Sequence, residues 1–337
     1  MSETTTPSAH GVPIADVLDR VGSLAQVARV DSFIEAEGVA RGARRLRVVT
    51  GGGLEFDVHP DRGLDIGAAS FDGVPLAWLS STGIAAPALY DPAGRGWLRT
   101  FGGGLVTTCG LDSFGPPADD EDGVVGMHGR ISHVPATVTT VEATPERVLI
   151  AGTVRQTAVF AENLALRREI SSEVGSSTLT ISDTVTNEGA EASPLMVLYH
   201  VNLGWPLLDE GTTLDIPSAS VAPRDADAES GFGQQYEIGA PVAGFREQVY
   251  IHEADEQRYA RVTNRARGLE LTLRYSDTLP ALFEWKMTAT KHYVLGLEPA
   301  NTPEINGRAV ARTNGRLPYL QPGESVTYRV SIEVGRL

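Results

Sequence analysis

Short stretches of alternating apolar and polar residues recur from residue 46 almost to the end of this 337-residue chain. Alternation puts every second side chain on one face of a β-strand, and turn-forming residues separate the stretches. Many short strands with few helices are typical of two antiparallel sheets packed face to face. We therefore predict an all-β fold, a large antiparallel β-sandwich. The main stretches are Leu46–Val49, Leu54–Val58, Leu64–Ile66, Phe71–Leu76, Ala136–Val141, Arg147–Val154, Leu164–Ile170, Ser177–Val185, Leu195–Val201, Gly268–Tyr275, His292–Leu297 and Ser325–Val334.

One segment near the N-terminus has a different period. Between Val12 and Val30, apolar residues recur at intervals of three and four, which predicts a short amphipathic helix laid on the sheet. We expect a tail and capping helix over residues 1–30 and a single β-sandwich domain over residues 31–337, because no linker or repeat divides the latter. Residues 209–245 are polar and glycine-rich, and predict a long excursion over one face.

Charge and composition exclude several classes of partner. The net charge of -15 at pH 7 argues against nucleic acid and anionic membrane surfaces. No apolar run approaches the roughly 18 residues of a membrane span, and the first residues lack the pattern of a signal peptide. Cys109 is the only cysteine, so the chain cannot form an intramolecular disulfide. We expect a cytoplasmic protein with a small-molecule partner, either a monomer or a homodimer.

Two polar residues lie within the apolar stretch that runs from Pro194 to Leu208. His200 and Asn202 are two positions apart, so on a strand they project from the same face. This run alone leaves open whether His200 is a core residue with satisfied nitrogens or a functional group. Glu298 closes another apolar stretch, where a carboxylate is costly unless it has a partner or a function. Burial raises the pKa of a carboxyl group, which suits Glu298 to general-base chemistry near neutral pH.

Two glycine-rich segments supply further candidates. Arg99 precedes three consecutive glycines, and His128 and Arg130 lie two apart among glycines, which favours a close approach of the backbone to a ligand. Glycine-rich turns with solvated charges are the alternative. The pattern of a phosphate-binding loop is absent, and so is a metal-binding spacing such as His-Glu-x-x-His. We therefore expect no metal.

Four short sequence motifs then follow one another along the chain, and their order is informative. They are a Leu-x-x-x-Arg-x-Ile strand at Leu164–Ile170, a strand leading to Asn-x-Gly at Leu179–Gly189, a strand with a histidine and Asn-Leu at Leu198–Leu203, and a Glu-x-x-x-x-Pro segment at Glu298–Pro303. From about residue 45 onward, the chain resembles the galactose mutarotase-like (aldose 1-epimerase) superfamily. It is most similar to a branch described only as a domain of unknown function. The segments around Arg99 and His128 resemble those of the hexose-phosphate members.

The resemblance implies a supersandwich that binds a sugar on a concave sheet, with no cofactor. It implies that His200 is the general acid that protonates the ring oxygen and that Glu298 is the general base that takes the proton of the anomeric hydroxyl. His128 and Arg99 match groups that bind and polarise sugar oxygens. An acid and a base on opposite sides of one ring would lie about 5–8 Å apart, and we expect this pair to face each other across a cleft.

The chain departs from the superfamily at one point. The aspartate that binds sugar hydroxyls has no clear counterpart, and Glu284 and Lys286 are the candidates to replace it. Asn202, Arg62 and Arg130 complete the candidate substrate-binding set. These two arginines, together with Arg99 and Arg308, could recognise an anionic group on the sugar, with surface ion pairs as the alternative.

Three functions remain open at this point. The first is a cofactor-independent sugar mutarotase or epimerase, an isomerase of the aldose 1-epimerase type. The second is a keto-sugar isomerase or lyase that acts by enolisation, with Lys286 stabilising the enolate. The third is a non-catalytic carbohydrate-binding protein, in which tryptophans stack on sugar rings. The candidate tryptophans are Trp78, Trp97, Trp205 and Trp285.

Overall fold

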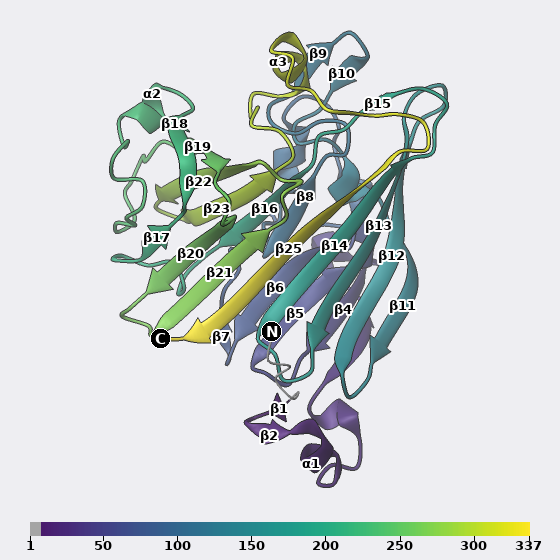
Figure 1. The fold of residues 1–337 in the computed structure, drawn as a ribbon, viewed down its shortest axis with the longest axis vertical. Helices are drawn as coiled ribbons and strands as arrows, with labels where there is room; N and C mark the ends of the chain where they lie inside the picture. The colour runs from purple at the N-terminus through teal and green to yellow at the C-terminus, as the bar shows by residue number, and fades with distance from the viewer. Residues whose placement is uncertain (1–7) are drawn as a thin grey trace.

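The alternating stretches pair into two large antiparallel sheets in the computed structural model, which describes residues 8–337 (Figure 1). In the eight-stranded sheet the order is β11 (Thr137–Ala143), β12 (Arg147–Thr157), β13 (Asn163–Glu173), β14 (Thr178–Asn187), β25 (Ser325–Arg336), β21 (Leu269–Tyr275), β20 (Tyr259–Asn264) and β17 (Thr213–Asp215). In the eleven-stranded sheet the order is β18 (Ser218–Pro223), β19 (Gln248–Ala254), β22 (Ala281–Ala289), β23 (His292–Ala300), β16 (Leu198–Leu203), β8 (Val106–Cys109), β6 (Asp65–Phe71), β5 (Leu54–His59), β4 (Arg44–Val49) and β3 (Arg29–Ile34), with β7 (Val74–Pro75) paired to β6.

Alternation decides which face of each strand is buried. In β14 every second residue from Leu179 to Asn187 is buried, and the residues between them are partly exposed. The apolar faces of the two sheets enclose one core, in which Leu179 and Ile332 of the smaller sheet join Leu46 and Leu297 of the larger. This arrangement confirms the predicted β-sandwich. No helix among residues 8–337 is both long enough and apolar enough to cross a membrane.

A fully buried arginine ties the two sheets together. The Arg168 side chain on β13 binds Asp183 on β14 at 2.6 Å and Asp65 on β6 at 3.1 Å. It also donates to the hydroxyl of Thr108 on β8, and the Tyr199 hydroxyl on β16 donates to Asp183 at 2.7 Å. A buried charge is stable only when it is paired and hydrogen-bonded in this way. The network therefore holds β16, the strand that carries His200, against the opposite sheet.

The predicted helix between Val12 and Val30 is wrong for most of its length. The helix α1 covers only Ile14–Leu18, a 3₁₀ turn follows at Leu24–Gln26, and β3 begins at Arg29. A short strand pair precedes and adjoins the helix, namely β1 (Ser8–Ala9) and β2 (Val12–Pro13). Ser23 explains the interruption, because its side chain accepts a hydrogen bond from the amide of Ala25 and begins a new turn. The fold thus has a short N-terminal helix, while the division of the chain at residue 30 stays a prediction.

The predicted excursion over residues 209–245 is more ordered than expected. It contains β17 and β18, which form edges of the two sheets, together with the helix α2 (Ala226–Glu229). Leu214 and Ile216 are buried in the common core, which explains why this polar segment folds back onto the sheets. The remaining elements are the pairs β9 (Ala118–Asp120) with β10 (Gly123–Val125) and β15 (Ser193–Pro194) with β24 (Tyr319–Leu320), and the helix α3 (Arg308–Thr313).

Candidate active site

His200 and Glu298 lie side by side on neighbouring strands. Val201 on β16 pairs with Leu297 on β23, and this register places His200 opposite Glu298. The Nε2 atom of His200 is 3.2 Å from Oε1 of Glu298, and both side chains are almost fully buried. Both line one cavity of about 350 Å³, a size suited to a small ligand. The expected separation of 5–8 Å is therefore wrong, since the two groups are in direct contact.

Aromatic side chains form much of the cavity wall. The ring centroid of His200 lies 5.2 Å from that of Phe101 and 5.2 Å from that of Trp285. Trp97 stacks on Phe101 at 4.3 Å and lies 4.6 Å from His128. All five residues line the cavity. Flat apolar rings beside a few polar groups are well suited to the faces and hydroxyls of a sugar.

Burial penalises charge on both members of the pair. It raises the pKa of Glu298 to about 8, an effect increased by the nearby Glu247 and opposed by Arg224. Burial also lowers the pKa of His200 well below its ordinary value, with His128 acting in the same direction. Near neutral pH the pair therefore holds one proton and no net charge. In this resting state Glu298, and not His200, carries the proton.

His128 and Asn202 lie close to this pair in different ways. The His128 ring lines the cavity, 5.9 Å from the His200 ring, and burial lowers its pKa to about 4. Its Nδ1 atom accepts a hydrogen bond from the amide of Gly115 at 3.4 Å, so the neutral ring can donate from Nε2 to a ligand hydroxyl. Asn202 shares a strand face with His200 but is fully buried, and its amide donates to the carbonyls of Gly104 and His200. It is not among the residues that line the cavity.

The three arginines of the candidate set lie outside this cavity. Arg99 is highly exposed and pairs with Asp91. Arg130 pairs with Glu162 beside another hollow of the surface. Arg62 is buried and lines a separate cavity. The structure thus brings none of the three to His200 and Glu298.

We expect the substitution Arg99→Ala to leave anomeric exchange within about twofold of wild type, because an exposed ion pair contributes little and the side chain lies outside the cavity. Steady-state rates over a range of sugar concentrations check this expectation. A loss of tenfold or more would mean that Arg99 reaches the substrate after a rearrangement of its segment.

Glu284 and Lys286 project from the opposite face of the sheet. In the β22–β23 pair, Phe283 lies opposite Glu298. Side chains alternate along a strand, so Trp285 shares the face of Glu298, whereas Glu284 and Lys286 point the other way. Neither lines the cavity. The expectation that they replace the missing aspartate is therefore wrong.

Both residues have structural partners where they lie. The Nζ atom of Lys286 donates to the carbonyls of Gln234 at 3.2 Å and Glu237 at 2.6 Å, which fastens the 209–245 segment to β22. The Oε2 atom of Glu284 lies 3.2 Å from Nε2 of His252, and both side chains are fully buried. These contacts give Lys286 and Glu284 structural roles away from the cavity.

The sequence did not single out several residues of the cavity. Phe101 and Glu247 both line it, and the Trp285 indole donates to Glu247 at 3.0 Å. Arg224 also lines it and binds Glu247 at 3.1 Å. Trp97 and Trp285 were candidates for sugar stacking, and their place in the cavity wall suits that role. Trp205 is exposed, with its indole bonded to Asp209.

No group of three or more His, Cys, Asp or Glu side chains within residues 8–337 is arranged to hold a metal ion. The titratable groups that meet in the cavity are instead an imidazole and a carboxyl group in contact, with a second imidazole nearby. Such a pair can give a proton to one atom of a ligand and take a proton from another.

The sandwich and its cavity define a galactose mutarotase-like fold. One similar structure is that of a "putative aldose 1-epimerase" from Klebsiella pneumoniae, at 26% identity and a TM-score of 0.84 over 90% of this chain and 83% of that one. Two more distant ones share the fold. A galactose mutarotase-like protein from Clostridium acetobutylicum has 14% identity and a TM-score of 0.67 over 93% and 100% of the two chains. A galactose 1-epimerase from Lactobacillus acidophilus has 13% identity and a TM-score of 0.61 over 92% and 99%.

The family itself is identified by sequence. The model of the family described as "Domain of unknown function (DUF4432)" matches residues 40–334. The chain therefore belongs to this family, and the matched residues include nearly all of the β-sandwich. No curated protein sequence matches the chain.

Proposed function

We propose that this protein is a cofactor-independent mutarotase or epimerase that interconverts the anomers of a free sugar or sugar derivative. The contact between His200 and Glu298 inside a buried, aromatic cavity carries the proposal. Strongly perturbed titratable groups that meet in a cavity are typical of acid–base catalysis. The likeness to the Klebsiella protein supports the same reaction class.

The short distance within the pair fits ring opening. The anomeric hydroxyl and the ring oxygen are bonded to the same carbon, so an acid and a base that reach both atoms stand next to each other. One group takes the proton of the anomeric hydroxyl, the bond from the anomeric carbon to the ring oxygen breaks, and the other group protonates the ring oxygen. Rotation of the open-chain aldehyde followed by the reverse steps gives the other anomer and restores both groups.

The one-proton state of the pair supplies this chemistry without a net change in charge. The resting distribution favours Glu298 as the donor to the ring oxygen and His200 as the acceptor, the reverse of the roles that the family resemblance implies. We therefore assign catalysis to the pair as a unit. His128 is placed to bind a sugar hydroxyl, and Trp97 and Trp285 to pack against the ring.

The enolisation alternative loses its main support, and the binding alternative accounts for less of the cavity. Enolisation of a keto-sugar relied on Lys286 beside the acid–base pair, and Lys286 instead binds two backbone carbonyls on the other face of the sheet. A pure binding protein has no need of a buried carboxyl group whose pKa is raised to about 8. Anomeric exchange measured by NMR on a panel of free sugars tests the proposal, with acceleration for at least one sugar as the expected result.

A further inference from the structure

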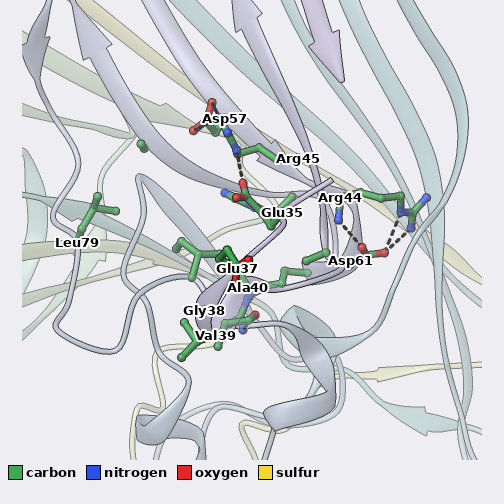
Figure 2. A pocket seen from close by; sticks show the side chains of 16 residues that line it. Glu35, Glu37, Gly38, Val39, Ala40, Arg44, Arg45, Asp57, Asp61 and Leu79 are labelled. Carbon is green, nitrogen blue, oxygen red and sulfur yellow. Dashed lines mark hydrogen bonds and ion pairs between the residues drawn. The ribbon is translucent and has the colours of Figure 1, made fainter. Parts of the chain in front are cut away.

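A second cavity lies on the large sheet. It encloses about 370 Å³ and shares no lining residue with the active-site cavity. Residues of β4, β5 and β6 line it. The 3₁₀ turn Gly38–Ala40 and Leu79, both labelled in Figure 2, line it as well. A volume of this size holds a ligand of roughly sugar dimensions.

A buried arginine with few partners lines this cavity. Arg62 is only 4% exposed, yet its single side-chain hydrogen bond within residues 8–337 runs from Nη1 to the carbonyl of Ala85 at 3.0 Å. No ion pair joins it to a carboxylate in that part of the chain, in contrast to the fully paired Arg168. A guanidinium has five N–H donors, so most of its donors remain available to a ligand. Burial lowers the pKa of Arg62 to about 10, which leaves it charged at neutral pH.

A buried histidine stands beside this arginine. His59 lines the same cavity, is 8% exposed, and its ring packs over Gly67, where a β-carbon would lie 2.2 Å from Nε2. Within residues 8–337 its ring makes no hydrogen bond, and burial together with the charge of Arg62 lowers its pKa to about 4. The neutral ring therefore offers one donor and one acceptor to a ligand.

The rim of the cavity is acidic, but its charges are largely paired. Arg44 binds Asp61 at 2.6 Å, and Arg45 binds Glu35 at 2.5 Å and Asp57 at 3.4 Å, as the dashed lines in Figure 2 show in part. The carboxylates can accept further hydrogen bonds from hydroxyl groups. They also repel a second negative charge, which disfavours a phosphate dianion and favours a ligand with one carboxylate.

We propose that this cavity is a second small-molecule site, which binds a polyhydroxylated monocarboxylate of the sugar-acid class. The planar guanidinium of Arg62 matches a carboxylate in two parallel hydrogen bonds. Hydroxyl groups of the ligand meet His59 and the rim carboxylates of Glu35 and Asp57. The proposal is independent of the proposed ring-opening activity, because the two cavities have separate linings.

Titration calorimetry with D-gluconate and D-sorbitol tests the site. The two probes have the same open chain of hydroxyls and differ in the carboxylate, and neither has an anomeric carbon. We expect gluconate to bind at one site per chain and sorbitol to bind at least about tenfold more weakly, because the charge-assisted contact is lost. Equal affinities for the two probes, or no gluconate binding up to about 10 mM, would overturn the proposal.

Three variants locate the binding. Arg62→Gln removes the charge, and Ala40→Phe fills the cavity from the turn that crosses it without changing any charge. We expect each to weaken gluconate binding at least about tenfold, and Glu298→Gln to leave it unchanged. The Ala40→Phe variant decides the matter if thermal melting shows that Arg62→Gln does not fold. Gluconate binding that survives Ala40→Phe, or that is lost with Glu298→Gln, would place the ligand elsewhere and refute the site.

Discussion

The substitution Glu298→Gln is expected to lower the rate of anomeric exchange by about 10²–10⁴-fold, the usual contribution of a positioned acid or base. The amide preserves the shape of the side chain but can neither hold nor release the shared proton. The wild-type rate should fall as the pH rises above about 8, because Glu298 then loses the proton of the one-proton pair. Exchange rates measured over a pH series for both proteins check this result.

The same substitution, which lowers the rate, should not lower the thermal stability of the protein. Glu298 has a folded-state pKa of about 8, above its ordinary value of 4.5, so the unfolded chain ionises first as the pH rises. This carboxyl group therefore lowers the stability of the wild type progressively between those two values. The Glu298→Gln variant lacks that loss and should melt at an equal or higher temperature at pH 8. Lower stability of the variant across the whole range would show that the carboxyl group has a structural role.

Glu247→Gln is the matched control, because it changes another glutamate of the same cavity. Glu247 is about half exposed and does not contact His200. Its removal takes a negative charge away from Glu298, so the pKa of Glu298 should fall and the high-pH limb of activity should move to lower pH. If Glu247→Gln lost as much rate as Glu298→Gln, Glu298 would have no catalytic role distinct from that of Glu247.

The second large effect is expected for His200→Gln, again a loss of about 10²–10⁴-fold. The double variant with Glu298→Gln should lose little more than either single variant, because the two groups act as a unit that shares one proton. A double-variant cycle on kcat/KM checks this coupling. If the loss of the double variant equalled the product of the two single losses, His200 and Glu298 would act in separate steps.

His128→Gln serves as the control for the histidine. Its ring lines the same cavity but has no ion pair with Glu298 within residues 8–337. A hydroxyl contact to the substrate is worth about 2- to 12-fold in rate or affinity, so the change should appear mainly in KM. A fall in kcat equal to that of His200→Gln would assign the proton transfer to His128 instead.

The sequence was most informative where the period of its pattern matches a strand. The alternation in stretches such as Ser177–Val185 predicted both the strands and the sandwich, because the pattern records which face is buried. It failed between Val12 and Val30, where apolar residues at helical spacing belong to a short helix, a turn and the edge strand β3. There, packing of individual side chains into the core overrides the local period.

The candidate site, too, was predictable from the sequence only in part. The family resemblance led us to expect His200 and Glu298 at one cleft, whereas their 3.2 Å contact depends on the register of β16 with β23. Register also separates Glu284 from Trp285, since a shift of one residue exchanges the two faces of a strand. Pairing between strands distant in sequence is not encoded in either strand alone, so these side-chain directions were not predictable.

Charged residues were the least predictable. Arg168 belongs to a motif that marked a strand, but nothing in that motif indicated a buried ion network between the sheets. Arg99 lies two positions after Trp97 in one short turn, and the tryptophan is buried while the arginine is exposed. Long charged side chains take directions that depend on distant partners, here Asp183 and Asp91.

Anomeric exchange followed by proton NMR in deuterated water, with a panel of free aldoses and ketoses, tests the central claim most directly. The His200–Glu298 pair should accelerate interconversion of the anomers of at least one sugar, without deuterium entering any carbon position. The double variant at these two residues should show only the uncatalysed rate. Deuterium on carbon would indicate enolisation, and unaccelerated exchange despite tight sugar binding would indicate a binding protein; either result would contradict the proposed function.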